Sequence, residues 1–138
     1  MEVDALDGRP GVETRRFAGP NATDDENNAK LLAELEGLAA AERTARYQCV
    51  LAFLDPTEAP GGDVSRGLVR QRMGTLEGRI ARKPKGKGGF GYDPIFEPAT
   101  EPPGGRTVAQ MKPAEKNEIS HRGQAALAMG DWLRTRGY

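Results

Sequence analysis

Apolar side chains recur at helical spacing in the first third of the chain. A helix over residues 24–36 would carry one apolar face made of Leu31, Leu32 and Leu35, continued by Leu38. Thr23 and Glu26 stand three residues apart and form a capping box at its start, and Gly37 is suited to end it. The pattern predicts an amphipathic helix that packs on a core.

The C-terminal part of the chain predicts two more helices. Residues 113–119 read as a short helix, and Ser120 is a candidate N-cap for a longer one. The apolar face of the longer helix follows the i, i+3, i+4, i+7, i+8 pattern and consists of Ala125, Ala128, Met129, Trp132 and Leu133. His121 falls in its first turn, on the side that faces the core, and Arg122 is its neighbour.

Strands are predicted between these helical parts. Residues 46–54 are almost continuously apolar, which predicts a strand covered on both faces, with Cys49 as a small buried hydrophobe. Residues 68–73 alternate apolar and polar positions, and residues 75–81 resume after the interruption at Gly74. The short connections favour an antiparallel meander.

The remaining stretches are predicted as turns or short strand ends. Residues 2–6 fit a strand end, residues 12–17 are too mixed to assign, and residues 55–63 and 97–106 are rich in proline and glycine. The pattern as a whole predicts an α/β protein.

Composition narrows the class of protein. A chain of 138 residues favours one domain, 1–138. Its net charge of zero favours neither a strongly acidic nor a strongly basic partner. The single cysteine excludes an intrachain disulfide, and no apolar run is long enough to cross a membrane. We therefore expect a soluble cytoplasmic protein without a membrane partner.

Residues 87–96 combine three glycines, three aromatic rings, one carboxylate and one proline. Glycine permits positive φ angles and a close approach of a flat ligand. Phe90 offers a ring face, and Asp93 can accept hydrogen bonds from ligand N–H groups. Two interpretations stay open from composition alone: a glycine-rich hairpin with aromatic packing, or a ligand-binding loop.

Charged runs give further candidates. Residues 79–87 contain five basic side chains, which form either a solvated run or a patch that attracts phosphate. With the nearby aromatic rings they also fit a nucleic-acid groove, but the zero net charge makes nucleic acid an unlikely partner. Asp24, Asp25 and Glu26 suggest a metal site, although capping and the helix dipole already explain them.

A second cluster follows about 25 residues after the aromatic stretch. Lys116, His121 and Arg122 place three nitrogen-bearing side chains within seven residues. The sequence lacks a Walker A motif, and one cysteine and one histidine cannot form a Cys/His metal cluster.

Three blocks in this order resemble the inosine triphosphatase family, the dITP/XTP pyrophosphatases. They are Ala22-Thr-Asp-Asp-Glu-Asn-Asn-Ala-Lys-Leu-Leu, Gly88-Gly-Phe-Gly-Tyr-Asp-Pro-Ile-Phe and Glu115-Lys-Asn-Glu-Ile-Ser-His-Arg-Gly. The resemblance implies hydrolysis of ITP, dITP or XTP to the monophosphate and pyrophosphate, with Mg²⁺, by a homodimer. The implied fold is α/β, with an elongated mixed β-sheet flanked by helices.

The resemblance also implies the roles of seven residues. Phe90 stacks on the purine, and Gly91, Tyr92 and Asp93 line the base pocket. The base edge or nearby substrate atoms are reached by Lys116, His121 and Arg122. Hypoxanthine and xanthine carry a 6-oxo acceptor where adenine has an amino donor, so the donor-only Lys116 and Arg122 favour the deaminated bases.

One large departure separates this sequence from the family. The family has an N-terminal half with a Thr/Ser-Gly-Asn phosphate loop, a metal-binding glutamate, a phosphate-binding lysine and an Asp-Asp-Ser-Gly segment that supplies the catalytic carboxylate. Here Met1 stands where the leucine after that segment is expected, so the chain corresponds to the C-terminal two-thirds. No residue is assigned as catalytic or metal-binding. Two explanations stay open: a translation start assigned too late, or an inactive fragment that binds nucleotide or dimerises.

Overall fold

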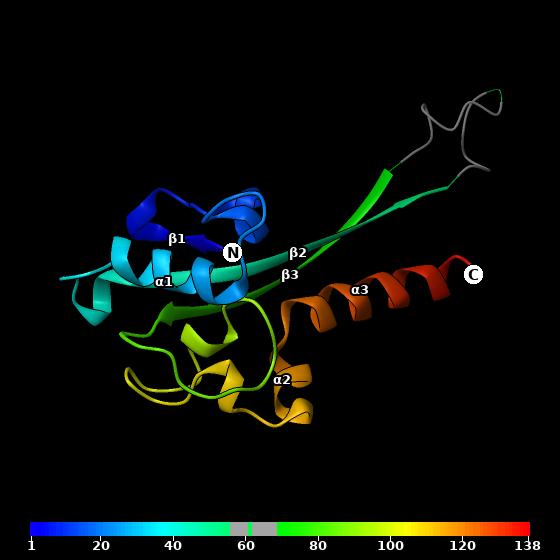
Figure 1. Cartoon of the computed structure of the whole chain (residues 1–138). Helices are drawn as coiled ribbons and strands as arrows, with labels where there is room; N and C mark the ends of the chain where they lie inside the picture. Colours follow the sequence, from blue (N-terminus) through cyan, green and yellow to red (C-terminus); the bar gives the residue numbers. More distant parts are fainter. Residues whose placement is uncertain (56–60, 62–68) are drawn as a thin grey trace. The chain divides into compact units, whose positions relative to one another are not determined.

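The computed structural model describes residues 1–55, 61 and 69–138 (Figure 1). Contacts divide the chain into two compact units. Unit 1 comprises Met1–Tyr47 and Leu76–Glu118, and unit 2 comprises Gln48–Thr75 and Ile119–Tyr138. The prediction of a single domain over residues 1–138 stays a prediction, and most of the turn expected over residues 55–63 lies outside the described residues.

The described strands form a four-stranded sheet in the order β1-β2-β3-β4 (Figure 1). The strands are β1 (Glu2–Val3), β2 (Thr44–Leu54), β3 (Val69–Ile80) and β4 (Phe96–Pro98). Strands β1 and β2 pair antiparallel, with Glu2 opposite Arg46, and β3 and β4 pair antiparallel, with Ile80 opposite Phe96. Together with the helices, this sheet confirms the predicted α/β class.

Strand β3 runs without a break through Gly74, so the prediction of two separate strands is wrong. The glycine has a packing role instead. A Cβ at this position would lie 2.0 Å from the backbone oxygen of His121 and 2.8 Å from the nitrogen of Ala125. A glycine here allows the first turns of the last helix to lie directly against the strand.

The prediction that residues 46–54 are covered on both faces is also wrong. Burial alternates along β2 in unit 2, where Val50 and Leu54 are exposed and Cys49 is only half-buried. Phe53, which points the other way, packs edge-on against Trp132. An antiparallel sheet can leave one face open, so a long apolar run does not require two covered faces.

Helix α1 (Asp24–Glu34) is slightly shorter than the predicted 24–36, and its capping box is confirmed. Thr23 accepts a hydrogen bond from the Glu26 amide, and Glu26 accepts one from the Thr23 amide. Leu31 and Leu35 are fully buried in the core of unit 1. Other fully buried apolar side chains in unit 1 include Val3, Ile80, Ile95 and Phe96.

Helix α2 (Pro113–Ile119) and helix α3 (His121–Thr135) confirm the C-terminal predictions. Ser120 caps α3, because its hydroxyl oxygen accepts a hydrogen bond from Gly123 N at 3.0 Å. Ala125 and Met129 are the buried positions of α3. The strand end predicted over residues 2–6 is confined to β1, because Asp4–Leu6 form a 3-10 turn, and most of the unassigned residues 12–17 belong to the 3-10 turn Gly11–Arg16.

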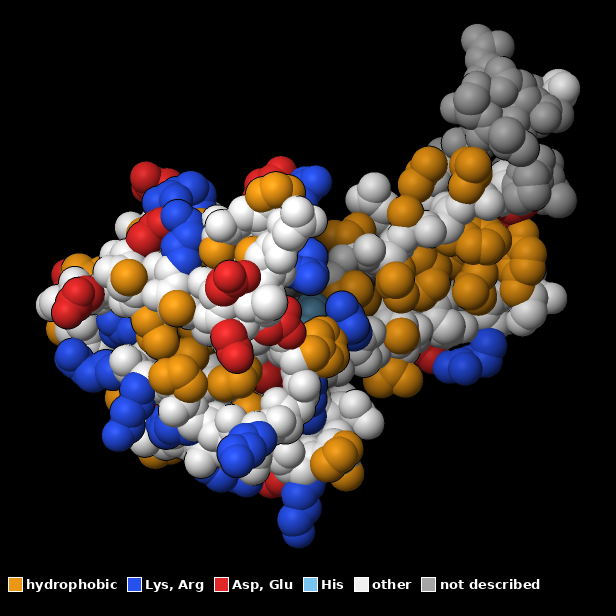
Figure 2. Space-filling view, in the orientation of Figure 1, with side chains coloured by type: hydrophobic (Ala, Val, Ile, Leu, Met, Phe, Trp, Pro, Cys, Tyr) orange, Lys and Arg blue, Asp and Glu red, His pale blue; other side chains and the backbone are white. Residues whose placement is uncertain are grey.

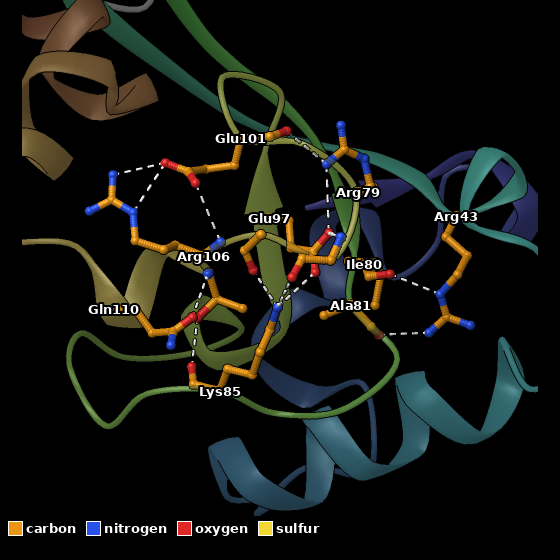
Figure 3. Close-up of polar contacts among 12 residues, drawn as sticks. Arg43, Arg79, Ile80, Ala81, Lys85, Glu97, Glu101, Arg106 and Gln110 are labelled. Atoms are coloured by element: carbon orange, nitrogen blue, oxygen red, sulfur yellow. Dashed lines mark hydrogen bonds and ion pairs between the residues drawn. The ribbon is translucent and has the colours of Figure 1, made fainter.

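A buried arginine connects the end of α1 to the end of β3. The Arg43 guanidinium donates to the carbonyl oxygens of Ile80 at 2.8 Å, Ala81 at 2.8 Å and Leu35 at 2.5 Å, two of which Figure 3 shows. Burial, followed by the nearby charge of Arg82, lowers the pKa of Arg43. Arg43 therefore links three carbonyl oxygens, one at the end of an α-helix and two at the end of a strand, through a buried guanidinium group.

The part of β2, β3 and α3 in unit 2 carries a large exposed apolar surface (Figure 2). The exposed large apolar side chains of the described part of unit 2 are Val50 and Leu54 on β2, Val69 and Met73 on β3, Leu127 on α3 and the C-terminal Tyr138. We call the four exposed strand residues the unit 2 apolar surface. Across the described residues, no helix combines the length and the apolar character that a membrane crossing requires.

Candidate functional site in unit 1

Residues 87–96, here called the aromatic loop, make a tight turn around Asp93. The Phe90 amide donates to the Asp93 carboxylate at 3.0 Å, and the Asp93 amide donates to the Phe90 carbonyl oxygen at 3.2 Å. Gly89 has a φ of +74°, and a Cβ there would lie 2.0 Å from Asp93 Oδ2. The loop therefore needs glycine at position 89 for both its backbone angle and its contact with the carboxylate.

The two aromatic side chains beside Gly91 differ in solvent exposure and in their contacts. Phe90 is 58% exposed, so its ring is available to a flat ligand. Tyr92 is 3% exposed, and its hydroxyl donates to the Thr14 carbonyl oxygen at 2.7 Å. Burial, followed by the nearby Asp24 carboxylate, raises the pKa of Tyr92. Tyr92 thus anchors the loop in the core of unit 1.

Asp93 and Lys116 form an ion pair at the base of the loop. Lys116 Nζ lies 2.6 Å from Asp93 Oδ2, and the Asp93 side chain is almost fully buried. The same ammonium group lies over the Phe90 ring, 4.6 Å from its centroid. Helix α2 therefore brings Lys116 to the exposed ring, as the predicted site requires.

Tyr47 is a fourth group around Asp93 that sequence reasoning missed. Its ring packs on Phe96, with centroids 4.6 Å apart, and its hydroxyl hydrogen-bonds the Asp93 side chain. Burial, followed by the charge of Asp93, raises the pKa of Tyr47 well above its usual value. Because Tyr47 lies in β2, far from the loop in sequence, only the strand's place in the sheet reveals this contact.

Helix α1 also holds the aromatic loop. Asp24 Oδ2 accepts a hydrogen bond from Gly91 N at 2.7 Å, and Asn28 Nδ2 donates to Gly91 O at 3.1 Å. The sequence analysis assigned Asp24 to the positive end of the helix dipole, with a metal site as the alternative, and gave Asn28 no role. The i, i+4 spacing was the available signal, since it places both side chains on one helix face.

His121 and Arg122 lie in unit 2, at the start of α3. His121 is half-buried and Arg122 is exposed. The structure thus brings together Phe90, Gly91, Tyr92, Asp93 and Lys116 in unit 1. That His121 and Arg122 join these five residues stays a prediction.

Two of the five basic side chains over residues 79–87, Arg79 and Lys85, form ion pairs with a buried glutamate (Figure 3). Glu97, 3% exposed, lies 3.0 Å from Lys85 Nζ and 3.6 Å from Arg79 Nη1. Lys85 also donates to the carbonyl oxygens of Gly104 and Gly105. These bonds connect the loop that follows β4 to the residues just before the aromatic loop. Because Arg79 and Lys85 are engaged in these contacts, the basic patch is smaller than the sequence suggested.

The candidate metal ligands do not form a cluster among the described residues. They contain no group of three or more His, Cys, Asp or Glu side chains that could hold a metal ion. Mg²⁺ is bound through oxygen ligands, chiefly carboxylates. Asp24 and Glu26 serve Gly91 and the helix cap instead.

The family pattern "Ham1 family" matches residues 1–132. This chain belongs to the Ham1 family. The resemblance carried by the three sequence blocks is thereby confirmed. Among curated relatives, the dITP/XTP pyrophosphatase of Methylococcus capsulatus is 44% identical over 134 residues, which cover 97% of this chain and 62% of the relative. The dITP/XTP pyrophosphatase of Thioalkalivibrio sulfidiphilus is also 44% identical, over 99% of this chain and 64% of the relative.

Solved Ham1 structures show the same fold. The Staphylococcus aureus Ham1 protein aligns with a TM-score of 0.84 at 34% identity, over 98% of this chain and 63% of that one. A HAM1 protein from Coxiella burnetii aligns with a TM-score of 0.83 at 40% identity, over 97% of this chain and 63% of that one. This chain therefore spans less than two-thirds of the length of these relatives.

Proposed function

We propose that this Ham1 chain supplies the base-recognition site of a pyrophosphatase that acts on deaminated purine nucleoside triphosphates. The reaction converts ITP, dITP or XTP to the monophosphate and pyrophosphate. The observation that carries the proposal is the exposed Phe90 ring with the Lys116 ammonium group over it, held by the buried Asp93. Aromatic stacking and a fixed donor are the two features that purine recognition needs.

The energies favour a purine on the Phe90 ring. Stacking of a base on an aromatic side chain contributes about 1–3 kcal/mol. The contact of an exposed ring with an ammonium group contributes about 0.5–1 kcal/mol. The stacking free energy of a base on that ring face thus exceeds the cation–π free energy lost when the base displaces the Lys116 ammonium group. Lys116 keeps its ion pair with Asp93 and lies beside the base edge.

Donor chemistry supports selectivity for the deaminated bases. Lys116 can only donate hydrogen bonds, so it pairs with a 6-oxo group and leaves the 6-amino group of adenine without a partner. A donor left unpaired in a desolvated site costs about 1–3 kcal/mol. The family resemblance adds His121 and Arg122 to this recognition. Guanine also carries a 6-oxo group, so its rejection must depend on its 2-amino group.

A second candidate function is nucleotide binding without turnover by the 138 residues themselves. The specific observation in its favour is that the described residues contain no metal-binding cluster. We expect the isolated chain to bind ITP without releasing pyrophosphate.

We also propose that the protein is a homodimer, as the resemblance implies. The unit 2 apolar surface is of the kind that a second copy covers in oligomers. Met73→Lys should then shift the chain toward the monomer in light scattering. Val12→Lys is the matched control, because Val12 is 98% exposed but lies in unit 1. Equal masses for both variants would remove this surface from the interface.

Calorimetric titration of the purified chain tests the base site. ITP should bind more tightly than ATP, and Phe90→Ala should weaken ITP binding by about 1–3 kcal/mol. Val12→Ala removes another exposed apolar side chain, outside the loop, and should leave the affinity unchanged. Equal affinity for ITP and ATP, or unchanged binding by Phe90→Ala, would contradict the proposal.

A further inference from the structure

We propose that Asp24 and Asn28 of α1 are positioning residues for base recognition, because they hold Gly91 and thereby orient Phe90. The inference rests on the proposed function, which it deepens. Neither residue is among the seven that the family resemblance assigns to the substrate. Both act through the backbone of the aromatic loop, without touching the base themselves.

The two side chains fix both peptide groups that flank Gly91. The N–H that Asp24 accepts, at 2.7 Å, belongs to the Phe90–Gly91 peptide. The carbonyl to which Asn28 donates, at 3.1 Å, belongs to the Gly91–Tyr92 peptide. With both peptide planes held, the backbone angles of Gly91 are set from one helix face, and so is the direction in which the Phe90 side chain leaves the chain.

The loop needs this external support. Gly91 has a φ of +61°, and glycine resists changes of φ and ψ less than any other residue. The Phe90 ring is largely exposed and lies under the Lys116 ammonium group of α2, so its direction depends on the loop backbone as well as on that contact. A ring that is oriented before the ligand arrives avoids the loss of conformational entropy on binding, which would otherwise reduce the affinity.

The burial of Asn28 indicates a role beyond helix packing. Asn28 is 4% exposed, and its Oδ1 has no hydrogen-bond partner among the described residues. A buried acceptor without a partner disfavours folding, so an apolar residue would suit this position better if packing were its only purpose. Its Nδ2 faces the Gly91 carbonyl, which is the contact that an apolar residue could not make.

Asp25 offers a matched control for Asp24. Both carboxylates lie in the first turn of α1 and both stabilise the helix through its dipole. Of these two carboxylates, only that of Asp24 accepts a hydrogen bond from the aromatic loop among the described residues. A role limited to the helix predicts the same behaviour for both, and the positioning role predicts a difference.

The first measurement uses the chain without nucleotide. Amide hydrogen exchange at Gly91, followed by NMR, should become about tenfold faster in Asp24→Ala, since a hydrogen bond to a charged acceptor is lost. Asp24→Asn keeps an acceptor oxygen and should restore part of the protection. Asp25→Ala should leave Gly91 exchange unchanged, although it lowers the melting temperature about as much as Asp24→Ala does.

The second measurement is ITP affinity. Asp24→Ala and Asn28→Ala should each weaken ITP binding by about five- to tenfold, while Asp25→Ala stays within about twofold of the wild type. Equal exchange and equal affinity in Asp24→Ala and Asp25→Ala would overturn the inference. A wild-type chain that binds no ITP would instead overturn the proposed function, and Gly91 exchange would still decide whether Asp24 holds the loop.

Discussion

Lys116 and Asp93 form an ion pair of 2.6 Å between α2 and the aromatic loop. The same ammonium group lies 4.6 Å from the centroid of the Phe90 ring. One cation therefore neutralises a buried carboxylate and marks the ring face where we expect a purine to stack. The pair links loop stability to ligand recognition, and substitutions there should affect both.

Lys116→Met tests this link, because methionine keeps much of the apolar stem and removes the charge. The buried Asp93 carboxylate then loses its cation, which should cost about 1–3 kcal/mol of stability. The preference for ITP over ATP should fall at the same time. Thermal unfolding and nucleotide titration measure the two effects.

The double variant Lys116→Met/Asp93→Asn supplies the control. Without the carboxylate no buried charge is left unpaired, so much of the lost stability should return while the ITP preference stays low. If the double variant loses as much free energy of unfolding as the two single variants lose together, the two residues act independently.

Gly89→Ala should destabilise the aromatic loop more than Gly91→Ala does. Both glycines have positive φ, +74° and +61°, so alanine is strained by about 1–2 kcal/mol at either position. Only at Gly89 would the added Cβ also collide with Asp93 Oδ2. Denaturant unfolding of the two variants measures the difference, and equal losses of stability would contradict the close approach.

Gly74→Ala and Gly130→Ala should change stability in opposite directions. A Cβ at position 74 would lie 2.0 Å from the His121 oxygen, so alanine must push α3 away from β3 in unit 2. Gly130, inside α3, has open space around a Cβ, and alanine there should stabilise by up to about 1 kcal/mol. Melting temperatures test both changes, and a neutral Gly74→Ala would exclude the predicted packing.

Alkaline pH should unfold the aromatic loop as Tyr92 ionises. The folded-state pKa of Tyr92 is raised above its usual value of 10.0, mainly by burial. The stability that this shift contributes is therefore complete below pH 10, and it is lost as the pH rises above that value toward the folded-state pKa. Tyrosinate absorbance should show Tyr92 titrating late and together with unfolding.

Tyr92→Phe identifies that signal among the three tyrosines. Because the pKa of Tyr47 is raised as well, the variant should keep a late step of smaller amplitude, and it should also lose the hydrogen bond to the Thr14 carbonyl oxygen. A late step of unchanged amplitude in the variant would assign that step to Tyr47 and not to Tyr92.

The sequence by itself determined the local elements. The capping box of Thr23 and Glu26 and the N-cap of Ser120 connect residues three apart, so their partners can be read along the chain. The candidate ligand residues of the aromatic loop were also recognisable, because their glycines and rings stand within ten positions. Helix boundaries followed from these local bonds to within a few residues.

Only the tertiary structure decided how distant segments meet. The Lys116–Asp93 bond joins residues 23 apart, and the Asp24–Gly91 bond joins residues 67 apart. From the sequence, Gly74 predicts a break in the strand, whereas in the structure the strand continues and α3 packs against this glycine. Such contacts depend on the relative placement of helices and strands, which is set by packing of the whole unit, and no local spacing in the sequence encodes it.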